Sequence, residues 1–437
     1  MSFKIDKQTL EELNLLGKFR QGSVYHLFNK VKTRGGEKLL DDMFHHPLLD
    51  ENAINNRTAV FRFFQDQQFS FPFDVMQINL MREYLDAGGK KNEAMVLIDI
   101  MFKKLLSGLT RDERFRKIVQ GLQATIVTLK KCAAIAETMQ TKNGVFENRV
   151  QAVRAVLRGK QLDSLLNTDI YQNLPLQKIA HFDYLLKNEL AKAMQEIMEF
   201  IYELDVNIAV GSVAAARGFT YARALPAARD VLSASDLRHP CLESAIGNDI
   251  LMSETKNVIF LTGANMAGKS TLMKSIGILM YLAHMGFPLA AKDTEFSVRE
   301  GMYTSINVAD NIGLGYSHFY AEVVRVKQAA EAAASGSRLL LMFDELFKGT
   351  NVKDAYDGTL SVTQAFSGYT DCLFVVSTHI IEVGEALREN DNIRFAFMPT
   401  VMEGARPRYT YRLQEGITED RQGMMIIRNE GILELLK

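Results

Sequence analysis

A lysine and a serine follow two glycines at a spacing that suits the binding of phosphate groups. The stretch FLTGANMAGKSTLMK contains Gly263, four further residues, and then Gly268, Lys269 and Ser270. Glycine adopts backbone angles that other residues avoid, so such a loop can turn successive N–H groups toward one anion. The lysine adds a positive charge, and the hydroxyl group adds a ligand for Mg²⁺. The spacing therefore predicts a nucleotide-binding P-loop.

The residues on either side of this loop provide the context that a P-loop requires. An apolar run at 257–262 predicts a strand before the loop, and a helix-forming run at 271–285 follows it. The N-terminus of that helix would direct its positive end at the phosphates. The alternative is a fortuitous glycine-rich turn, which would need neither flanking element.

We expect the loop to bind ATP together with Mg²⁺. The N–H groups at 266–271 would cradle the β- and γ-phosphates, Lys269 would reach their oxygens, and the Ser270 hydroxyl would bind Mg²⁺. Lys269 is therefore also a candidate catalytic residue. The predicted nucleotide-binding residues of the loop are Gly263, Ala264, Asn265, Met266, Ala267, Gly268, Lys269, Ser270 and Thr271.

Two carboxylates end a second apolar run about 75 residues downstream. In RLLLMFDEL, Asp344 and Glu345 follow residues that predict a buried strand. Asp344 would hold Mg²⁺, and Glu345 would polarise the attacking water. A third run, FVVSTHIIE, places His379 where it would face the γ-phosphate if its strand neighbours the Asp344 strand. Without the P-loop, a solvated strand end and a structural histidine would be the simpler interpretations.

The composition narrows the classes of protein to which the chain could belong. The 437 residues are 47% apolar and 24% charged, with a formal net charge of −1, which is ordinary for a globular protein. The three cysteines form no CxxC pair, which argues against a disulfide framework or a zinc site. The N-terminal residues lack the apolar core of a signal peptide, and no apolar run is long enough to span a bilayer. We therefore expect a cytoplasmic protein.

Helix-period apolar residues dominate the first half of the chain. Residues 181–216 predict one long helix that acts as a strut between domains, and the alternative is two helices broken near Gly211. Residues 101–160 contain 13 Lys and Arg against 4 Asp and Glu. This excess indicates either a surface that meets phosphates or a solvated helical face balanced by acidic neighbours.

The pattern changes after about residue 235, where short β-rich runs alternate with helical stretches. This alternation predicts a mostly parallel sheet covered by helices. The fold class expected is therefore multidomain, with an all-α part followed by an α/β P-loop NTPase domain. The predicted strands are 257–262, 338–345, 372–379 and 393–399.

Several stretches resemble, in order and spacing, the MutS family of mismatch-repair ATPases. The loop TGANMAGKST is similar to the GxNMxGKST of that family, and FDELFKGTN and STH are similar to its Walker B segment and histidine switch. LRHPCLE resembles the segment that leads into the family's ATPase domain. ADNIGLGYSHFYAEV resembles the family's second signature, and QGMMIIRNEGI resembles the segment that packs the ATPase dimer.

The resemblance implies a domain organisation and two further site residues. It implies a helical core and lever domain at 1–220 and an ABC-type ATPase and dimerisation domain at 221–437. Ser317 would approach the γ-phosphate bound by a partner subunit, although a serine there would also cap a helix. Asn248 lies in IGNDI, where the family packs adenine, and a plain turn is the alternative.

Some residues depart from the family's pattern. The Phe-x-Glu wedge with which mismatch-reading members probe DNA is absent, since the one Phe-x-Glu belongs to the Walker B segment at 343–345. The sequence starts at the core domain, and the residues at 73–181 are too few for the core helices and a full clamp. Ala267 replaces a usual glycine. We therefore expect no mismatch-reading domain and a reduced or absent clamp.

These observations favour a MutS-like, Mg²⁺-dependent ATPase that binds mismatched or branched DNA as a homodimer, in repair or recombination. One alternative is an ATP-dependent dimeric interaction protein without a direct grip on DNA, which the neutral net charge would suit. A second is an ABC transporter ATPase, which would need an LSGGQ-like signature that the sequence lacks. A third is a small-molecule kinase, and the carboxylate of Glu345 after an apolar strand favours water over a substrate hydroxyl.

Overall fold

The computed structural model describes residues 2–17, 22–110, 112–139, 145–169, 174–306, 318–403, 406–418 and 435. The chain divides into two compact units. The first, called the helical unit, comprises Asn29–Asp42 and Ala59–Ser212. The second, called the α/β unit, comprises Met1–Phe28, Met43–Thr58 and Val213–Lys437.

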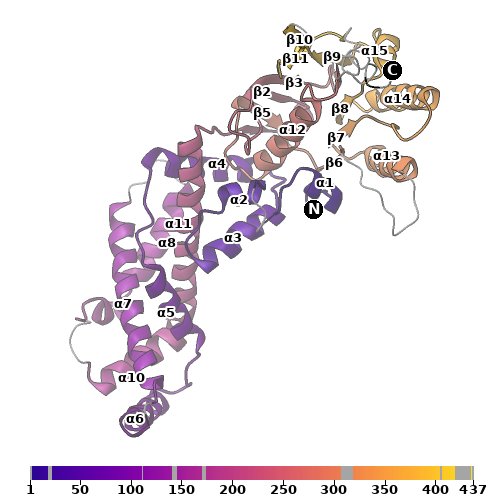
Figure 1. The fold of residues 1–437 in the computed structure, drawn as a ribbon. Helices are drawn as coiled ribbons and strands as arrows, with labels where there is room; N and C mark the ends of the chain where they lie inside the picture. Colours follow the sequence, from indigo (N-terminus) through magenta and orange to yellow (C-terminus); the bar gives the residue numbers. More distant parts are fainter. Residues whose placement is uncertain are drawn as a thin grey trace. The chain divides into compact units, whose positions relative to one another are not determined.

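The helical unit is a bundle whose helices surround one apolar core (Figure 1). On α7, Leu122, Ile126 and Leu129 recur at helical spacing and are buried. The side chain of Asn92 starts α6 by accepting a hydrogen bond from the N–H of Ala94. The helices are α5 (Val75–Asp86), α6 (Glu93–Leu109), α7 (Arg114–Thr138), α8 (Val145–Leu157), α9 (Lys160–Leu166) and α10 (Leu176–Tyr184), with parts of α3 (Arg34–His45), α4 (Glu51–Gln67) and α11 (Ala191–Arg217).

The expected single helix at 181–216 is interrupted, but not near Gly211. A π-helical segment at Leu185–Glu189 separates α10 from α11, and the N–H of Leu190 donates to the carbonyl of Leu185. α11 runs without a break through Gly211. A Cβ at that glycine would lie 2.8 Å from the backbone nitrogen of Gln65. Gly211 therefore allows close helix packing and does not break the helix.

A buried ion pair joins the π-helical segment to the last turn of α10. The ammonium of Lys187 is 2.8 Å from Asp183 and lies 4.0 Å from the centre of the Tyr84 ring. A buried lysine needs such partners because an unpaired buried charge is costly. These tertiary contacts accompany the wider helical turn and are not visible in the local sequence pattern.

The α/β unit contains a six-stranded sheet in the order β12-β9-β4-β8-β7-β6. All neighbouring strands are parallel except the β12–β9 pair. The four strands predicted from the sequence match β4, β7, β8 and β9. The strands of this sheet are β4 (Val258–Gly263), β6 (Gly301–Ser305), β7 (Leu339–Asp344), β8 (Leu373–Ser377), β9 (Ile393–Met398) and β12 (Gln414–Glu415).

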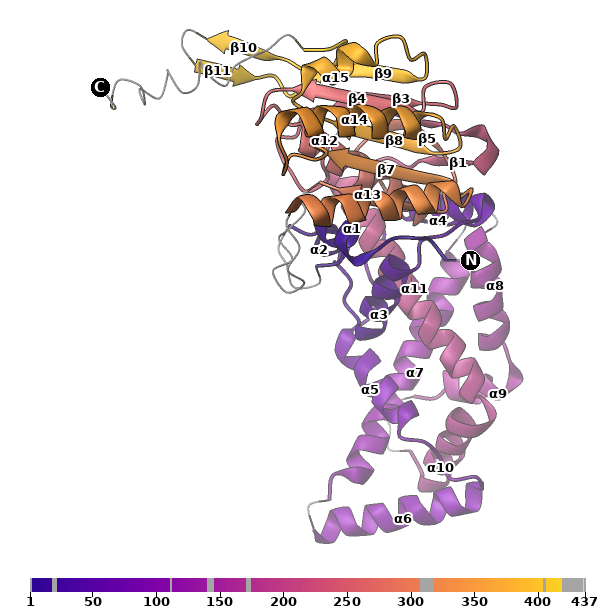
Figure 2. The same cartoon turned by 90° about the vertical axis from the view of Figure 1, so that its right-hand side faces the viewer.

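Helices cover both faces of this sheet (Figure 2). Phe343 of β7 belongs to a core cluster with Phe366 of α14, whereas Met342 approaches Gly277 of α12 from the opposite face. Strands buried on both faces read as continuous apolar runs, which explains why these were found from the sequence. The helices concerned are α12 (Lys269–His284), α13 (His318–Ala334), α14 (Val352–Ser367) and α15 (Ile381–Ala386).

The remaining elements of the α/β unit form a smaller sheet, a hairpin and an N-terminal segment. The smaller sheet has the order β1-β5-β2-β3, and β10 pairs with β11. Lys4 forms an isolated parallel bridge with Gly301 of β6. The elements are α1 (Lys7–Glu12), α2 (Val24–Phe28), β1 (Arg223–Leu225), β2 (Leu232–Leu237), β3 (Asn248–Met252), β5 (Lys292–Ser297), β10 (Thr400–Glu403) and β11 (Arg406–Tyr409).

The multidomain arrangement, helical first and α/β second, is confirmed in outline. Among the described residues, none of the helices is long and apolar enough to cross a membrane.

Candidate nucleotide-binding site

The loop between β4 and α12 has the backbone conformation that the glycines predict. Gly263 has φ of 140° and Gly268 has φ of 104°, both in the region that favours glycine. Met266 at the tip of the loop also has a positive φ, 70°, and is exposed. The loop leads directly into α12, which begins at Lys269. An anion placed in this loop would therefore meet the N-terminus of a 16-residue helix.

The Lys269 side chain folds back under the loop. Its ammonium group donates to the carbonyl oxygens of Gly263 at 2.8 Å and Ala264 at 3.2 Å. Burial lowers the pKa of Lys269, while the nearby carboxylates of Asp344 and Glu345 act in the opposite direction. The positive charge is thus held at the floor of the loop, beside two acidic groups.

The Ser270 hydroxyl lies against Asp344, which ends β7. Its Oγ donates to Oδ2 of Asp344 at 2.5 Å. The other carboxylate oxygen, Oδ1, is buried and has no hydrogen-bond partner among the described residues. A buried carboxylate oxygen without a partner is costly. A hydroxyl and a carboxylate side by side, with one oxygen unsatisfied, are a donor set that fits Mg²⁺.

Glu345 and His379 lie at the same edge of the sheet. Oε1 of Glu345 is 3.6 Å from Nδ1 of His379, and this histidine holds the pKa of the carboxyl below its ordinary value. Glu345 has a φ of 55°, rare for a residue with a side chain, and its N–H donates to the carbonyl of Ser377. The strand that leads to His379, β8, pairs with β7, the strand that ends at Asp344. The sequence analysis required this neighbouring arrangement for His379 to face the γ-phosphate.

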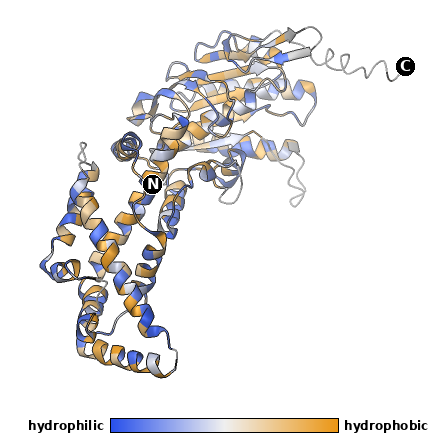
Figure 3. Ribbon diagram, turned by 60° about the vertical axis from the view of Figure 1, so that its left-hand side comes forward, coloured by the Kyte–Doolittle hydropathy of each residue, from blue (hydrophilic) through white to orange (hydrophobic). Residues whose placement is uncertain are grey.

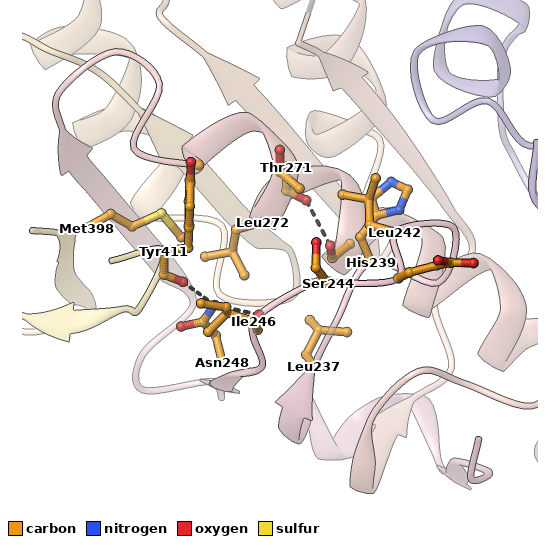
Figure 4. A pocket seen from close by; sticks show the side chains of 14 residues that line it. Leu237, His239, Leu242, Ser244, Ile246, Asn248, Thr271, Leu272, Met398 and Tyr411 are labelled. Atoms are coloured by element: carbon orange, nitrogen blue, oxygen red, sulfur yellow. Dashed lines mark hydrogen bonds between the residues drawn. The ribbon is translucent and has the colours of Figure 1, made fainter. Parts of the chain in front are cut away.

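A pocket of about 360 Å³ opens beside the loop (Figure 4), within the roughly 300–1,000 Å³ of ligand sites. Tyr411, Met398 and Leu272 supply apolar walls near Gly268. Asn248 also lines the pocket, but its amide is engaged with the backbone. Its Nδ2 donates to the carbonyl of Tyr411 at 3.0 Å, and its Oδ1 accepts from the N–H of Leu413 at 2.6 Å.

Tyr411 and Met398 were not predicted from the sequence. They lie more than 120 residues after the P-loop and belong to no motif with a fixed spacing. A ring carbon of Tyr411 would lie 3.0 Å from a Cβ added at Gly268, so the aromatic ring borders the phosphate loop itself. The one signal in the sequence was a pair of tyrosines, Tyr409 and Tyr411, separated by a single residue. In the structure their ring centres are 6.3 Å apart.

Comparisons with known proteins match two long segments of the chain. A family model described as MutS domain V matches residues 259–434, and one described as MutS domain III matches residues 8–211. The chain belongs to the MutS family. Both units of this MutS-family chain are therefore represented, and the P-loop and the strand ends described above lie within the domain V match.

Two curated relatives illustrate the similarity. The chain is 27% identical over 241 residues to "DNA mismatch repair protein MutS" of Pseudothermotoga lettingae, a match that covers 54% of the chain and 29% of the relative. It is 23% identical over 481 aligned positions to "DNA mismatch repair protein MSH7" of Arabidopsis thaliana, which covers 98% of the chain and 43% of the relative. The chain thus spans less than half the length of these relatives.

The signature serine of this MutS-family chain lies outside the described residues. Ser317 directly precedes α13, and nothing is described between residues 307 and 317. Among the described residues there is no group of three or more His, Cys, Asp or Glu side chains placed to hold a metal ion. A Mg²⁺ ion would therefore depend on the pair Ser270 and Asp344 together with the bound phosphates.

Many of the basic residues at 101–160 have partners within the helical unit. Several pair with carboxylates, and others donate to backbone carbonyls. This pattern favours the balanced helical face for these particular side chains. Arg116, Lys117 and Lys160 are exposed. The pairs are Lys103–Asp99, Arg114–Asp112, Arg149–Glu203 and Arg154–Glu147, with Lys130 and Lys131 donating to the carbonyls of Thr168 and Pro72.

Proposed function

We propose that the chain is a Mg²⁺-dependent ATPase of the MutS family that dimerises through its α/β unit and acts on mismatched or branched DNA. The observation that carries this proposal is the contact between Ser270 and Asp344 beneath the P-loop, with one oxygen of Asp344 left unsatisfied. In this proposal, residues 1–220 form the core and lever domain and residues 221–437 the ABC-type ATPase domain.

The P-loop residues bind and orient the triphosphate. The backbone N–H groups of residues 266–271 surround the phosphates at the N-terminus of α12. Lys269 exchanges its carbonyl contacts for phosphate oxygens, which offer the stronger, charge-assisted bonds. Mg²⁺, held near Ser270 and Asp344, would neutralise charge that develops on the β- and γ-phosphates.

Glu345 acts as the general base in hydrolysis. It accepts a proton from the attacking water, for which its carboxyl must be ionised. The neighbouring His379 favours the ionised form and lies close enough to orient the same water. The positive φ of Glu345 fixes the direction of its side chain at the end of β7, at a cost of backbone strain that recurs at functional sites.

The pocket beside the loop receives the adenine. Tyr411 offers an aromatic face next to Gly268, and Met398 and Leu272 complete an apolar slot. Asn248 acts here mainly by fixing the backbone of residues 411–413, which carries the tyrosine into the slot. We therefore propose Tyr411 as the principal contact to the base and Asn248 as a positioning residue.

ATP joins two copies of the chain, and the family resemblance of the signature segment supports this step. Ser317 of one copy would contact the γ-phosphate on the other, so that hydrolysis separates them. A contact that forms only when the γ-phosphate is present shifts the equilibrium between separate and paired copies. The helical unit would transmit the change to DNA.

The ATPase part of the proposal is tested with two variants. Lys269→Ala should lose nucleotide binding, whereas Glu345→Gln should bind Mg²⁺–ATP but release phosphate at least about 100-fold more slowly, as expected when a general base is lost. Binding is measured with a fluorescent ATP analogue and turnover by phosphate release. Turnover at the parent rate by Glu345→Gln would overturn the assignment of the base.

DNA binding is tested by filter retention of homoduplex, mismatched and four-way junction DNA, with and without ATP. Retention of the mismatched or junction DNA, decreasing steeply between 50 and 200 mM salt, would support phosphate contacts. Equal and negligible retention of all three would favour the alternative of an ATP-dependent interaction protein. The internal pairing of Arg149 and Arg154 is the observation that keeps this alternative in view.

A further inference from the structure

Helix α6 carries an apolar stripe on its exposed side. Met95, Ile98, Phe102, Leu105 and Leu109 follow one another at spacings of 3 and 4 residues, and Met101 borders them. The exposed fractions of these six side chains range from 53% to 73%. In Figure 3, α6 at the lower end of the helical unit is coloured largely as hydrophobic. Spacings of 3 and 4 residues are those of a coiled-coil seam.

The opposite side of α6 already holds the helix in the bundle. Val96 and Ile100 are buried in the core of the helical unit, and Glu93 lies 3.0 Å from His181 of α10. The exposed stripe is therefore additional to the face that packs the helix. A contiguous apolar stripe on the surface of a protein marks an interaction site more often than a chance arrangement.

We propose that the stripe on α6 packs antiparallel against α6 of a second copy of this chain. The charges beside the stripe select this occupant. Asp99 and Lys103 lie on the same flank and form an ion pair at 2.6 Å within one helix. In an antiparallel pair of identical helices, each flank meets its own counterpart, which brings Asp99 of one copy near Lys103 of the other.

The opposite flank of the stripe also fits this arrangement. It is lined by Ala94, Met101 and Gly108, which are small or apolar. Two such flanks can approach closely, and Gly108 has open space where a Cβ would be. A parallel pair would instead set the charged flank of one helix against the apolar flank of the other. Asp99 and Lys103 would then meet no complementary charges on the second helix. A two-fold antiparallel contact is therefore self-complementary in both shape and charge.

The contact is too small to hold two chains by itself. α6 has 17 residues and offers six apolar side chains, whereas stable interfaces use about 20–30 residues on each side. It becomes effective when another interface already joins the two copies, because the second contact then forms at millimolar effective concentration. The inference thus rests on the proposed ATP-dependent dimer, in which α6 supplies a second point of closure.

Disulfide trapping in the full-length chain tests this pairing. Phe102 lies at the middle of the stripe, so Phe102→Cys copies should crosslink with each other in Mg²⁺–ATP on the order of 100-fold faster than Met76→Cys copies. Met76 is the control because it is also an exposed apolar side chain of the helical unit. The antiparallel direction predicts that a mixture of Met95→Cys and Leu109→Cys chains crosslinks, whereas either alone does not.

Sedimentation of the same samples separates this inference from the proposed function. If the chains are dimeric with ATP but Phe102→Cys does not crosslink faster than the control, the α6 pairing is wrong and the ATP-dependent dimer stands. Flotation of that variant with lipid vesicles, or its binding of another protein, would then name a different occupant. If Phe102→Cys crosslinks rapidly and the chains sediment as dimers both with and without ATP, the pairing stands, the interface that supports it does not depend on ATP, and the proposed ATP-dependent dimer is wrong.

Discussion

Asp344→Asn is the change that most directly tests how the carboxylate beneath the P-loop works. The substitution keeps the size of the side chain and leaves an oxygen to accept the hydrogen bond from Ser270. It removes the negative charge and replaces one oxygen with an NH₂ group, which cannot bind a cation. Because Oδ1 has no partner among the described residues, the free energy of unfolding of the unliganded variant should stay within about 1 kcal/mol of that of the parent.

The magnitude of the effect on binding follows from linkage. Loss of a group that orients the ligands of a metal ion costs about 10–100-fold in affinity for the metal. We use the same range for the loss of the Asp344 carboxylate. At a Mg²⁺–ATP concentration 100 times the parent Kd, the nucleotide stabilises the parent by about 2.7 kcal/mol. The same concentration should stabilise Asp344→Asn by only about 0.4–1.4 kcal/mol.

Thermal unfolding with and without nucleotide measures this difference. At about 2–4 °C per kcal/mol for a unit of this size, the parent Tm should rise by about 5–11 °C and the variant Tm by about 1–6 °C. In EDTA with ATP, parent and variant should respond alike. Asp357→Asn, an exposed carboxylate on α14, should behave as the parent does. A Mg²⁺-dependent shift in Asp344→Asn equal to that of the parent would refute the reasoning.

Three further changes test other parts of the account. His379→Ala should move the acid limb of the pH–rate profile of hydrolysis to higher pH, when each protein's rates are scaled to its own maximum. The reason is that His379 lowers the pKa of Glu345, and the ionised form of Glu345 is lost as the pH falls through that pKa. An unchanged limb would remove His379 from this role. Tyr411→Ala should weaken the binding of ATP at least about 5-fold, because a stacking contact is lost, but leave the binding of inorganic triphosphate unchanged. Equal losses of affinity for the two ligands in calorimetric titrations would contradict the adenine slot. Gly211→Ala should lower the free energy of unfolding by about 1–3 kcal/mol, since its Cβ would lie 2.8 Å from the nitrogen of Gln65; a denaturant midpoint at or above that of the parent would show that the helices separate at no cost.

The parts of the site that could be predicted from sequence are those fixed by local spacing. The P-loop depends on glycines and a lysine within seven residues, and its strand and helix follow from the adjacent runs. The carboxylates at 344–345 and His379 each end an apolar run. Parallel strands bring their carboxyl ends to one edge of a sheet, so three separate stretches could be expected to meet there.

The parts that could not be predicted depend on tertiary packing. Tyr411 reaches Gly268 because Asn248 fixes the backbone of a distant turn, and neither residue's spacing carries that information. The π-helical segment at 185–189 accompanies a buried pair, Lys187 and Asp183, that is solvated in any unfolded chain. The long apolar run of α11 indicated a helix correctly, but periodicity cannot locate a change in hydrogen-bond pattern within it.

The most direct test of the central claim is the sedimentation velocity of the Glu345→Gln variant with and without Mg²⁺–ATP. We propose that ATP bound by the P-loop of one copy joins it to another, and that Glu345 ends this state by activating water. The variant should therefore change from monomer to a stable dimer when Mg²⁺–ATP is added, and Lys269→Ala should not. A single sedimentation coefficient for Glu345→Gln, unchanged at saturating Mg²⁺–ATP, would contradict the account.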